Sequence, residues 1–100
     1  MFLTFEELQN CIKKAEENNA CQSEINQLKQ LSSIEEFFYH PNCPFWLYWY
    51  AKNILHSRWL EAEEVIKTSP EYSYYYASYV LRSRWPEAEE VIKTSPEYSY

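Results

Sequence analysis

The sequence contains no glycine and no aspartate among its 100 residues. Glycine adopts positive backbone φ angles at little cost, so its absence excludes glycine-rich phosphate loops, dinucleotide-binding fingerprints and most two-residue hairpin turns. Without aspartate, every acidic role falls to fifteen glutamates, which favour helices. Both absences favour an all-helical chain.

Long apolar runs are also missing. No stretch reaches the roughly 18 apolar residues that would span a bilayer, and residues 1–8 lack the basic and apolar regions of a secretory signal. The three cysteines, Cys11, Cys21 and Cys43, form no Cys-x-x-Cys pair, and neither His40 nor His56 has neighbours at ligand spacing. We therefore expect a cytoplasmic protein with buried free thiols, no metal, no cofactor and no membrane contact.

Hydrophobic residues make up 46% of the chain and aromatic residues 19%, which is enough to build one packed domain at this length. The formal net charge of −6 disfavours nucleic acid and favours a protein partner with a basic surface. Glutamate pairs can serve as acid and base, but no nucleophile or metal set accompanies them. We expect no catalytic residues and no enzyme activity.

The most informative feature is an internal repeat. Segment 57–74 reads SRWLEAEEVIKTSPEYSY and segment 83–100 reads SRWPEAEEVIKTSPEYSY, so they differ only at Leu60 and Pro86 after a shift of 26 residues. A degenerate copy lies upstream, with Pro44 in the place of Pro70. Such a period is typical of stacked repeats. The predicted organisation is one continuous domain with an N-terminal helical cap at 1–32, a degenerate repeat at 33–58, a repeat at 59–84 and a truncated repeat at 85–100.

Each repeat is predicted to hold two helices, which gives an all-α solenoid of stacked helix pairs. The short helix runs over 59–67, and the long helix runs from Pro70, after the capping Ser69, to about Arg82. Upstream, a capping box of Thr4 and Glu7 predicts a helix to about Asn18, and 23–31 forms a second helix. The predicted core stripe of the long helices contains Ser73, Tyr76, Ala77, Val80 and Leu81, matching Leu47, Tyr50, Ala51, Ile54 and Leu55.

The motif R-W-x-E-A-E-x-x-I-x-x-S-P-x-Y-x-Y, followed by Tyr-Tyr-Ala, resembles tandem helical repeats of bacteriophage, bacterial and giant-virus proteins, in which copies read close to RWPEAE…I…P.YAYWYA. The resemblance covers residues 44–100, and residues 84–89 match in full. It implies a phage or mobile-element protein that acts inside a bacterial cell, and it implies no catalytic residues.

Aromatic side chains recur off the core stripe with the same period. They are either a concave face that grips a protein partner or packing between neighbouring repeats. The partner-binding candidates are Trp46, Tyr48, Trp49, Tyr72, Tyr74, Tyr75 and Tyr98.

Glutamates also recur, at Glu61, Glu63 and Glu64 and again at Glu87, Glu89 and Glu90. They form either a solvated helix face or an acidic strip that rims the aromatic face, for which the candidates are Glu61, Glu64, Glu87 and Glu90. Arg58 and Arg84 are expected to stack on the adjacent tryptophans or to pair with glutamates of the adjacent repeat. Trp59, placed between two repeats, is expected to contribute more stability than Trp85.

The predicted function is a protein–protein interaction module, used by a phage or mobile element to bind and inhibit a host protein. Three alternatives stay open. The acidic strip mimics nucleic acid and blocks a DNA- or RNA-binding protein; the aromatic rows stack single-stranded bases, although basic residues are few; or the chain assembles with itself, as a homodimer through its C-terminal edge.

Overall fold

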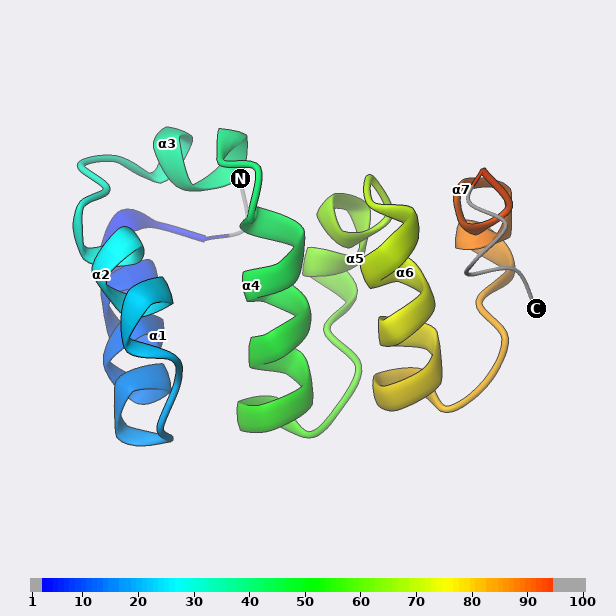
Figure 1. Ribbon diagram of the computed structural model, residues 1–100, viewed down its shortest axis with the longest axis horizontal. Helices are drawn as coiled ribbons and strands as arrows, with labels where there is room; N and C mark the ends of the chain where they lie inside the picture. Colours follow the sequence, from blue (N-terminus) through cyan, green and yellow to red (C-terminus); the bar gives the residue numbers. More distant parts are fainter. Residues whose placement is uncertain (1–2, 95–100) are drawn as a thin grey trace. The chain divides into compact units, whose positions relative to one another are not determined.

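The computed structural model describes residues 3–94, and all regular secondary structure in this range is helical. The predicted all-helical class is therefore confirmed. The chain divides into two compact units, Met1–Pro41 and Asn42–Tyr100 (Figure 1). Between residues 3 and 94, no helix is both long and apolar enough to cross a membrane.

The first unit contains α1 (Phe5–Glu17), α2 (Gln22–Lys29) and α3 (Ile34–Tyr39). The predicted capping box begins α1: the Glu7 N–H donates to Thr4 Oγ1 at 3.1 Å, and the Thr4 N–H donates to Glu7 Oε1 at 3.0 Å. α1 and α2 contact each other. Their buried apolar side chains are Leu8, Ile12, Ala15, Ile25 and Leu28.

The second unit alternates long and short helices. Each long helix is an α-helix that continues as a π-helix, α4 (Cys43–Tyr50) into η1 (Ala51–Leu55) and α6 (Pro70–Tyr76) into η2 (Ala77–Leu81). The short helices are α5 (Leu60–Ile66) and α7 (Glu89–Ile92), and the 3-10 helix η3 (Pro86–Ala88) precedes α7. Figure 1 shows the two long helices, α4 and α6, side by side and running in the same direction. The short helix α5 contacts both of them, and the short helix α7 contacts α6.

Local conformation in the second unit recurs after 26 residues. The π-helices η1 and η2 are each followed by a left-handed residue, His56 with φ 53° and Arg82 with φ 56°. The residues that precede the short helices also match, with φ −123° and ψ 84° at Trp59 and φ −120° and ψ 86° at Trp85. Because the chain has no glycine, bulkier residues adopt the left-handed conformation, at a cost of roughly 1–2 kcal/mol each.

Helix α6 begins as predicted. Ser69 Oγ accepts the Tyr72 N–H at 3.3 Å, and Pro70 takes the first helical position. The predicted core stripe is correct through Ala77, since Ser73, Tyr76 and Ala77 are fully buried. It is wrong at Leu55, which is 39% exposed, because i→i+5 bonding in a π-helix changes the angular spacing of side chains. Ile54, Val80 and Leu81 are half-buried.

Candidate interaction surface

A buried polar network joins the short and long helices of the repeat at 59–84. The Glu63 side chain is only 8% exposed. Arg58 donates to both of its oxygens, from Nε to Oε2 at 2.6 Å and from Nη2 to Oε1 at 2.9 Å. Tyr76 Oη donates to Glu63 Oε2 at 2.7 Å and accepts the Trp59 N–H at 2.9 Å. One hydroxyl therefore ties α6 to the first turn of α5.

The network changes the protonation chemistry of its members. Burial, reinforced by the hydrogen bond to Glu63, raises the pKa of Tyr76 well above its usual range. The hydrogen bond to Glu63 raises the pKa of Arg58, and a weaker electrostatic contribution comes from Glu87.

One prediction about these charges is wrong and another is correct. Glu63 does not belong to a solvated face, because Arg58 and Tyr76 satisfy its carboxylate inside the repeat. The expectation that the arginines pair with glutamates of the adjacent repeat is correct: Arg58, at the end of repeat 33–58, pairs with Glu63 of repeat 59–84. Likewise, Nη2 of Arg84, at the end of repeat 59–84, lies 2.8 Å from Oε1 of Glu89 in the next repeat. The five-residue spacing allows each arginine to reach the first turn of the following short helix.

An inner row of aromatic rings lies between each long helix and the next short helix. The Tyr50 and Trp59 rings are 5.4 Å apart, and the Tyr76 and Trp85 rings are 4.9 Å apart. Trp85 is 1% exposed, and its buried indole N–H has no acceptor within residues 3–94. Tyr50, Tyr76 and Trp85 are buried in the interior of the second unit, whereas Trp59 is half-buried.

An outer row of aromatic rings lies on α6 and η2, and we call it the tyrosine face: Tyr72, Tyr74, Tyr75 and Tyr79. Ring centroids are 6.1 Å apart for Tyr72 and Tyr75, 5.8 Å for Tyr74 and Tyr75, and 6.2 Å for Tyr75 and Tyr79. Tyr79 is 54% exposed, and the other three are half-buried.

Rings of α4 support the tyrosine face. The Phe45 ring lies 5.4 Å from that of Tyr72, and the Tyr48 ring lies 6.0 Å from Tyr72 and 6.2 Å from Tyr75. The interpretation as packing is therefore correct for these rings, which join α4 to α6, and parts of the same rings also reach solvent. The Nζ of Lys52 lies over the Tyr79 ring at 4.8 Å from its centroid.

Not all candidate aromatics lie at the surface. Trp46 and Tyr48 are 7% and 8% exposed, so their prediction as partner-binding residues is wrong. Helix α4 carries no charged residue and buries side chains around much of its circumference. Burial, followed by the effects of neighbouring tyrosines, raises the pKa of Tyr48 to about 12. Trp49 is half-buried, and Tyr98 lies outside the described residues.

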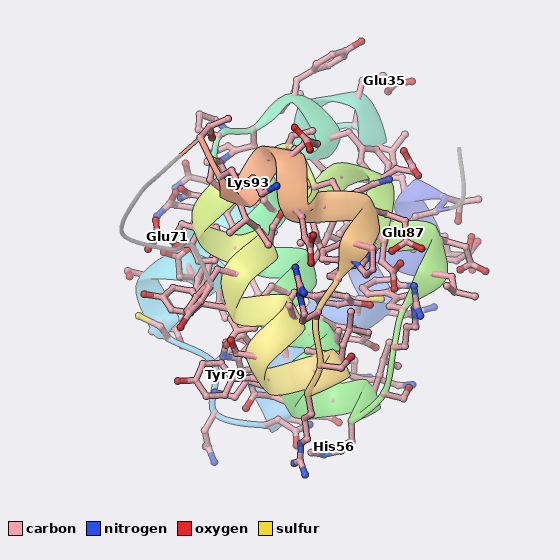
Figure 2. All side chains as sticks on the ribbon, turned by 90° about the vertical axis from the view of Figure 1, so that its right-hand side faces the viewer. Glu35, His56, Glu71, Tyr79, Glu87 and Lys93 are labelled. Atoms are coloured by element: carbon pink, nitrogen blue, oxygen red, sulfur yellow. The ribbon has the colours of Figure 1, made fainter. Side chains whose placement is uncertain are left out.

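The candidate glutamates Glu61, Glu64, Glu87 and Glu90 are exposed. Glu64 pairs with Lys67 at 3.0 Å, and Glu90 pairs with Lys93 at 3.9 Å, which reduces the net charge of the strip. In the view of Figure 2, Glu71 and Tyr79 lie on one side of α6 and Glu87 lies on the other. The prediction of one aromatic face rimmed by the repeated glutamates is therefore wrong at Glu87, which lies on a separate surface.

The first unit offers a groove of about 220 Å³ between α1 and α2, lined by apolar side chains such as Phe5 and Leu28 and by the ion pair of Lys29 with Glu16 at 2.7 Å.

The expectation of buried thiols is correct for Cys43 and wrong for the exposed Cys21. Burial raises the pKa of Cys43 to about 12. Within residues 3–94, no three His, Cys, Asp or Glu side chains come together as a metal site.

Sequence reasoning missed Tyr79, Lys52 and Phe45. A signal for Tyr79 was present, because Glu71, Tyr75 and Tyr79 follow one another at intervals of four residues and so share one face of a helix.

Searches for similar proteins found no matching family model, no matching curated protein and no matching solved structure.

Proposed function

We propose that this chain is a short α-solenoid with an N-terminal helical cap, and that it binds another protein through the tyrosine face. The recurrence of η1 and η2, of the left-handed His56 and Arg82, and of the parallel α4 and α6 supports the solenoid. Stacked helix pairs of this kind expose extended surfaces on which partners bind.

The observation that carries the proposal is the continuous chain of ring contacts from Tyr72 to the 54% exposed Tyr79. Tyrosine dominates binding hot spots because it buries a large area, keeps a polar hydroxyl and loses little conformational entropy. The tyrosine face also rests on Phe45 and the buried Tyr48. A rigid base of this kind reduces the cost of ordering the surface on binding.

The partner that best fits the charge is a protein with a basic surface, since the formal net charge is −6. The resemblance to phage-type repeats adds a biological setting: a phage or mobile-element protein that binds and inhibits a host protein.

The other readings have less support. A nucleic-acid mimic needs a row of uncompensated charges, yet arginine or lysine pairs with Glu63, Glu64, Glu89 and Glu90. Binding of single-stranded nucleic acid needs basic residues along the backbone path, and two of the arginines are already paired. Self-assembly through the C-terminal edge concerns residues 95–100, which lie outside the described residues.

Site-specific photo-crosslinking tests the proposal. A benzophenone amino acid replaces Tyr79 in one variant and Glu61, on the short-helix layer, in another. We expect a crosslink to one discrete protein from bacterial lysate at position 79, absent at position 61 and competed by excess unlabelled protein. Crosslinking only at position 61 would favour the acidic strip, and crosslinks only between copies of the chain would favour self-assembly; either result contradicts the proposal.

A further inference from the structure

The tyrosine face already holds one cation. The Lys52 ammonium lies 4.8 Å from the centroid of the Tyr79 ring, within the range of a cation–π contact. Both residues belong to π-helical segments that contact each other. The negative face of this ring is therefore accessible to a positive charge in the folded protein.

The spacing of the rings beyond Tyr79 is regular. The centroids of Tyr79 and Tyr75 are 6.2 Å apart, and those of Tyr75 and Tyr72 are 6.1 Å apart. In an extended peptide, side chains two residues apart point to the same side and are separated by about 6.6 Å. Two basic side chains at alternate positions of an extended segment therefore match two successive rings.

A carboxylate continues the same line. Glu71 lies four residues before Tyr75, so the two share one face of α6, and Figure 2 shows Glu71 on the same side of α6 as Tyr79. A third basic side chain of the segment finds an opposite charge there. The order along α6 and η2 is thus the Glu71 carboxylate, the Tyr75 ring and the Tyr79 ring, each about one helical turn from the next.

We infer that the tyrosine face binds an extended segment of a partner protein with lysine or arginine at alternate positions. This inference rests on the proposed function and names the chemistry of the partner at that site. Lys52 occupies Tyr79 when the partner is absent, so the partner's first basic side chain competes with it. Removal of this internal cation increases affinity for the segment.

The test uses two fluorescein-labelled peptides of equal composition, Lys-Thr-Lys-Thr-Lys-Thr and Lys-Lys-Lys-Thr-Thr-Thr, and fluorescence anisotropy with the full chain. We expect the alternating peptide to bind about two- to fivefold more tightly than the block peptide, and acetylation of its lysines to abolish binding. Equal affinity for the two lysine peptides, or no binding of either, overturns the inference.

Matched variants separate ring chemistry from net charge. Tyr75→Phe keeps the ring and retains the affinity for the alternating peptide, whereas Tyr75→Leu lowers it about two- to fivefold. Lys52→Gln raises it by a similar factor, and Glu61→Gln, on the other layer, leaves it unchanged. A loss in Glu61→Gln with none in Tyr75→Leu means attraction by net charge alone and overturns the inference. A protein crosslinked at position 79 without binding of the peptide leaves the proposed function standing and refutes only the basic-segment inference.

Discussion

Residues 57–68 and 83–94 differ at one position, yet their surroundings differ. Trp59 is half-buried and Trp85 is 1% exposed. The Glu63 side chain is 8% exposed and holds Arg58 with two hydrogen bonds, whereas Glu89 is 17% exposed and pairs with Arg84 at 2.8 Å. Backbone angles before the short helices are nevertheless nearly identical. The sequence thus determines the backbone angles before each short helix, while the residues that pack around each copy determine how deeply its side chains are buried.

The largest difference in stability is expected between alanine variants of the two tryptophans. Trp85→Ala should lower the free energy of unfolding by about 3–5 kcal/mol, the range for truncation of a buried aromatic residue, and Trp59→Ala by roughly half as much. This order reverses the expectation from sequence, because Trp85 is the more deeply buried of the two. Urea unfolding followed by circular dichroism measures both losses. Equal losses would show that burial in the two copies is the same in solution.

The next largest effect on stability is expected from a substitution in the polar network of the first copy. Tyr76→Phe keeps the ring but removes the bonds to Glu63 and to the Trp59 N–H, so we expect a loss of about 1–3 kcal/mol. Tyr79→Phe, at the exposed end of the tyrosine face, serves as the control and should change stability by less than about 0.5 kcal/mol. Urea midpoints at pH 7 provide the comparison. If the two variants lose the same free energy, the network contributes nothing specific.

The same hydroxyl predicts a dependence on pH. The pKa of Tyr76 is raised in the folded protein, so its contribution is complete below the unfolded value near 10 and is lost as the pH rises above it, at about 1.4 kcal/mol per pH unit. The stability difference between the wild type and Tyr76→Phe should therefore shrink between pH 10 and 11.5. A difference that stays constant over this range would place the hydroxyl in an exposed setting.

A smaller effect on stability is expected at the residue that precedes each copy. His56 and Arg82 both adopt left-handed backbone conformations. His56→Gly and Arg82→Gly should each raise stability by about 0.5–1 kcal/mol, since relief of the steric cost exceeds the added entropy of the unfolded chain. Ser78→Gly, within η2, should instead lower stability by up to about 1 kcal/mol. Thermal unfolding measures the midpoint of each variant. Equal midpoints for all three variants would contradict the left-handed conformations of His56 and Arg82.

The smallest effect tests the one sequence difference itself. Leu60→Pro makes the two copies identical, and proline suits the first helical position that Leu60 occupies in α5. Because Leu60 is 65% exposed, we expect a change below about 0.5 kcal/mol in urea unfolding and an unchanged circular dichroism spectrum. A loss above 1 kcal/mol would mean that α5 needs the Leu60 N–H or side chain.

Local signals predicted much of the fold. Thr4 with Glu7, and Ser69 with Pro70, marked helix starts correctly because capping depends on residues within one turn. The π-helical end of α4, which exposes Leu55, was not predictable from a 3.6-residue periodicity. The burial of Glu63 was also missed, because its partners lie five residues before it and thirteen after it. Three of the four rings of the tyrosine face were found from periodicity, whereas the contact of Lys52 with Tyr79 depends on the packing of η1 against η2.

The hydrogen bonds of Tyr76 have a consequence for how such a chain changes in evolution. Arg58, Glu63 and Tyr76 lie within 19 consecutive residues, 58–76, so one duplication event copies the whole set of donors and acceptors at once. In a new copy, the buried glutamate therefore already has its arginine and tyrosine partners. The copy also contains its own equivalents of Glu71, Tyr75 and Tyr79 on the long helix. Duplication of 26 residues can therefore lengthen the array without an unpaired buried charge. Each added copy also supplies another set of tyrosine rings, which under the proposed function would contact a longer partner segment.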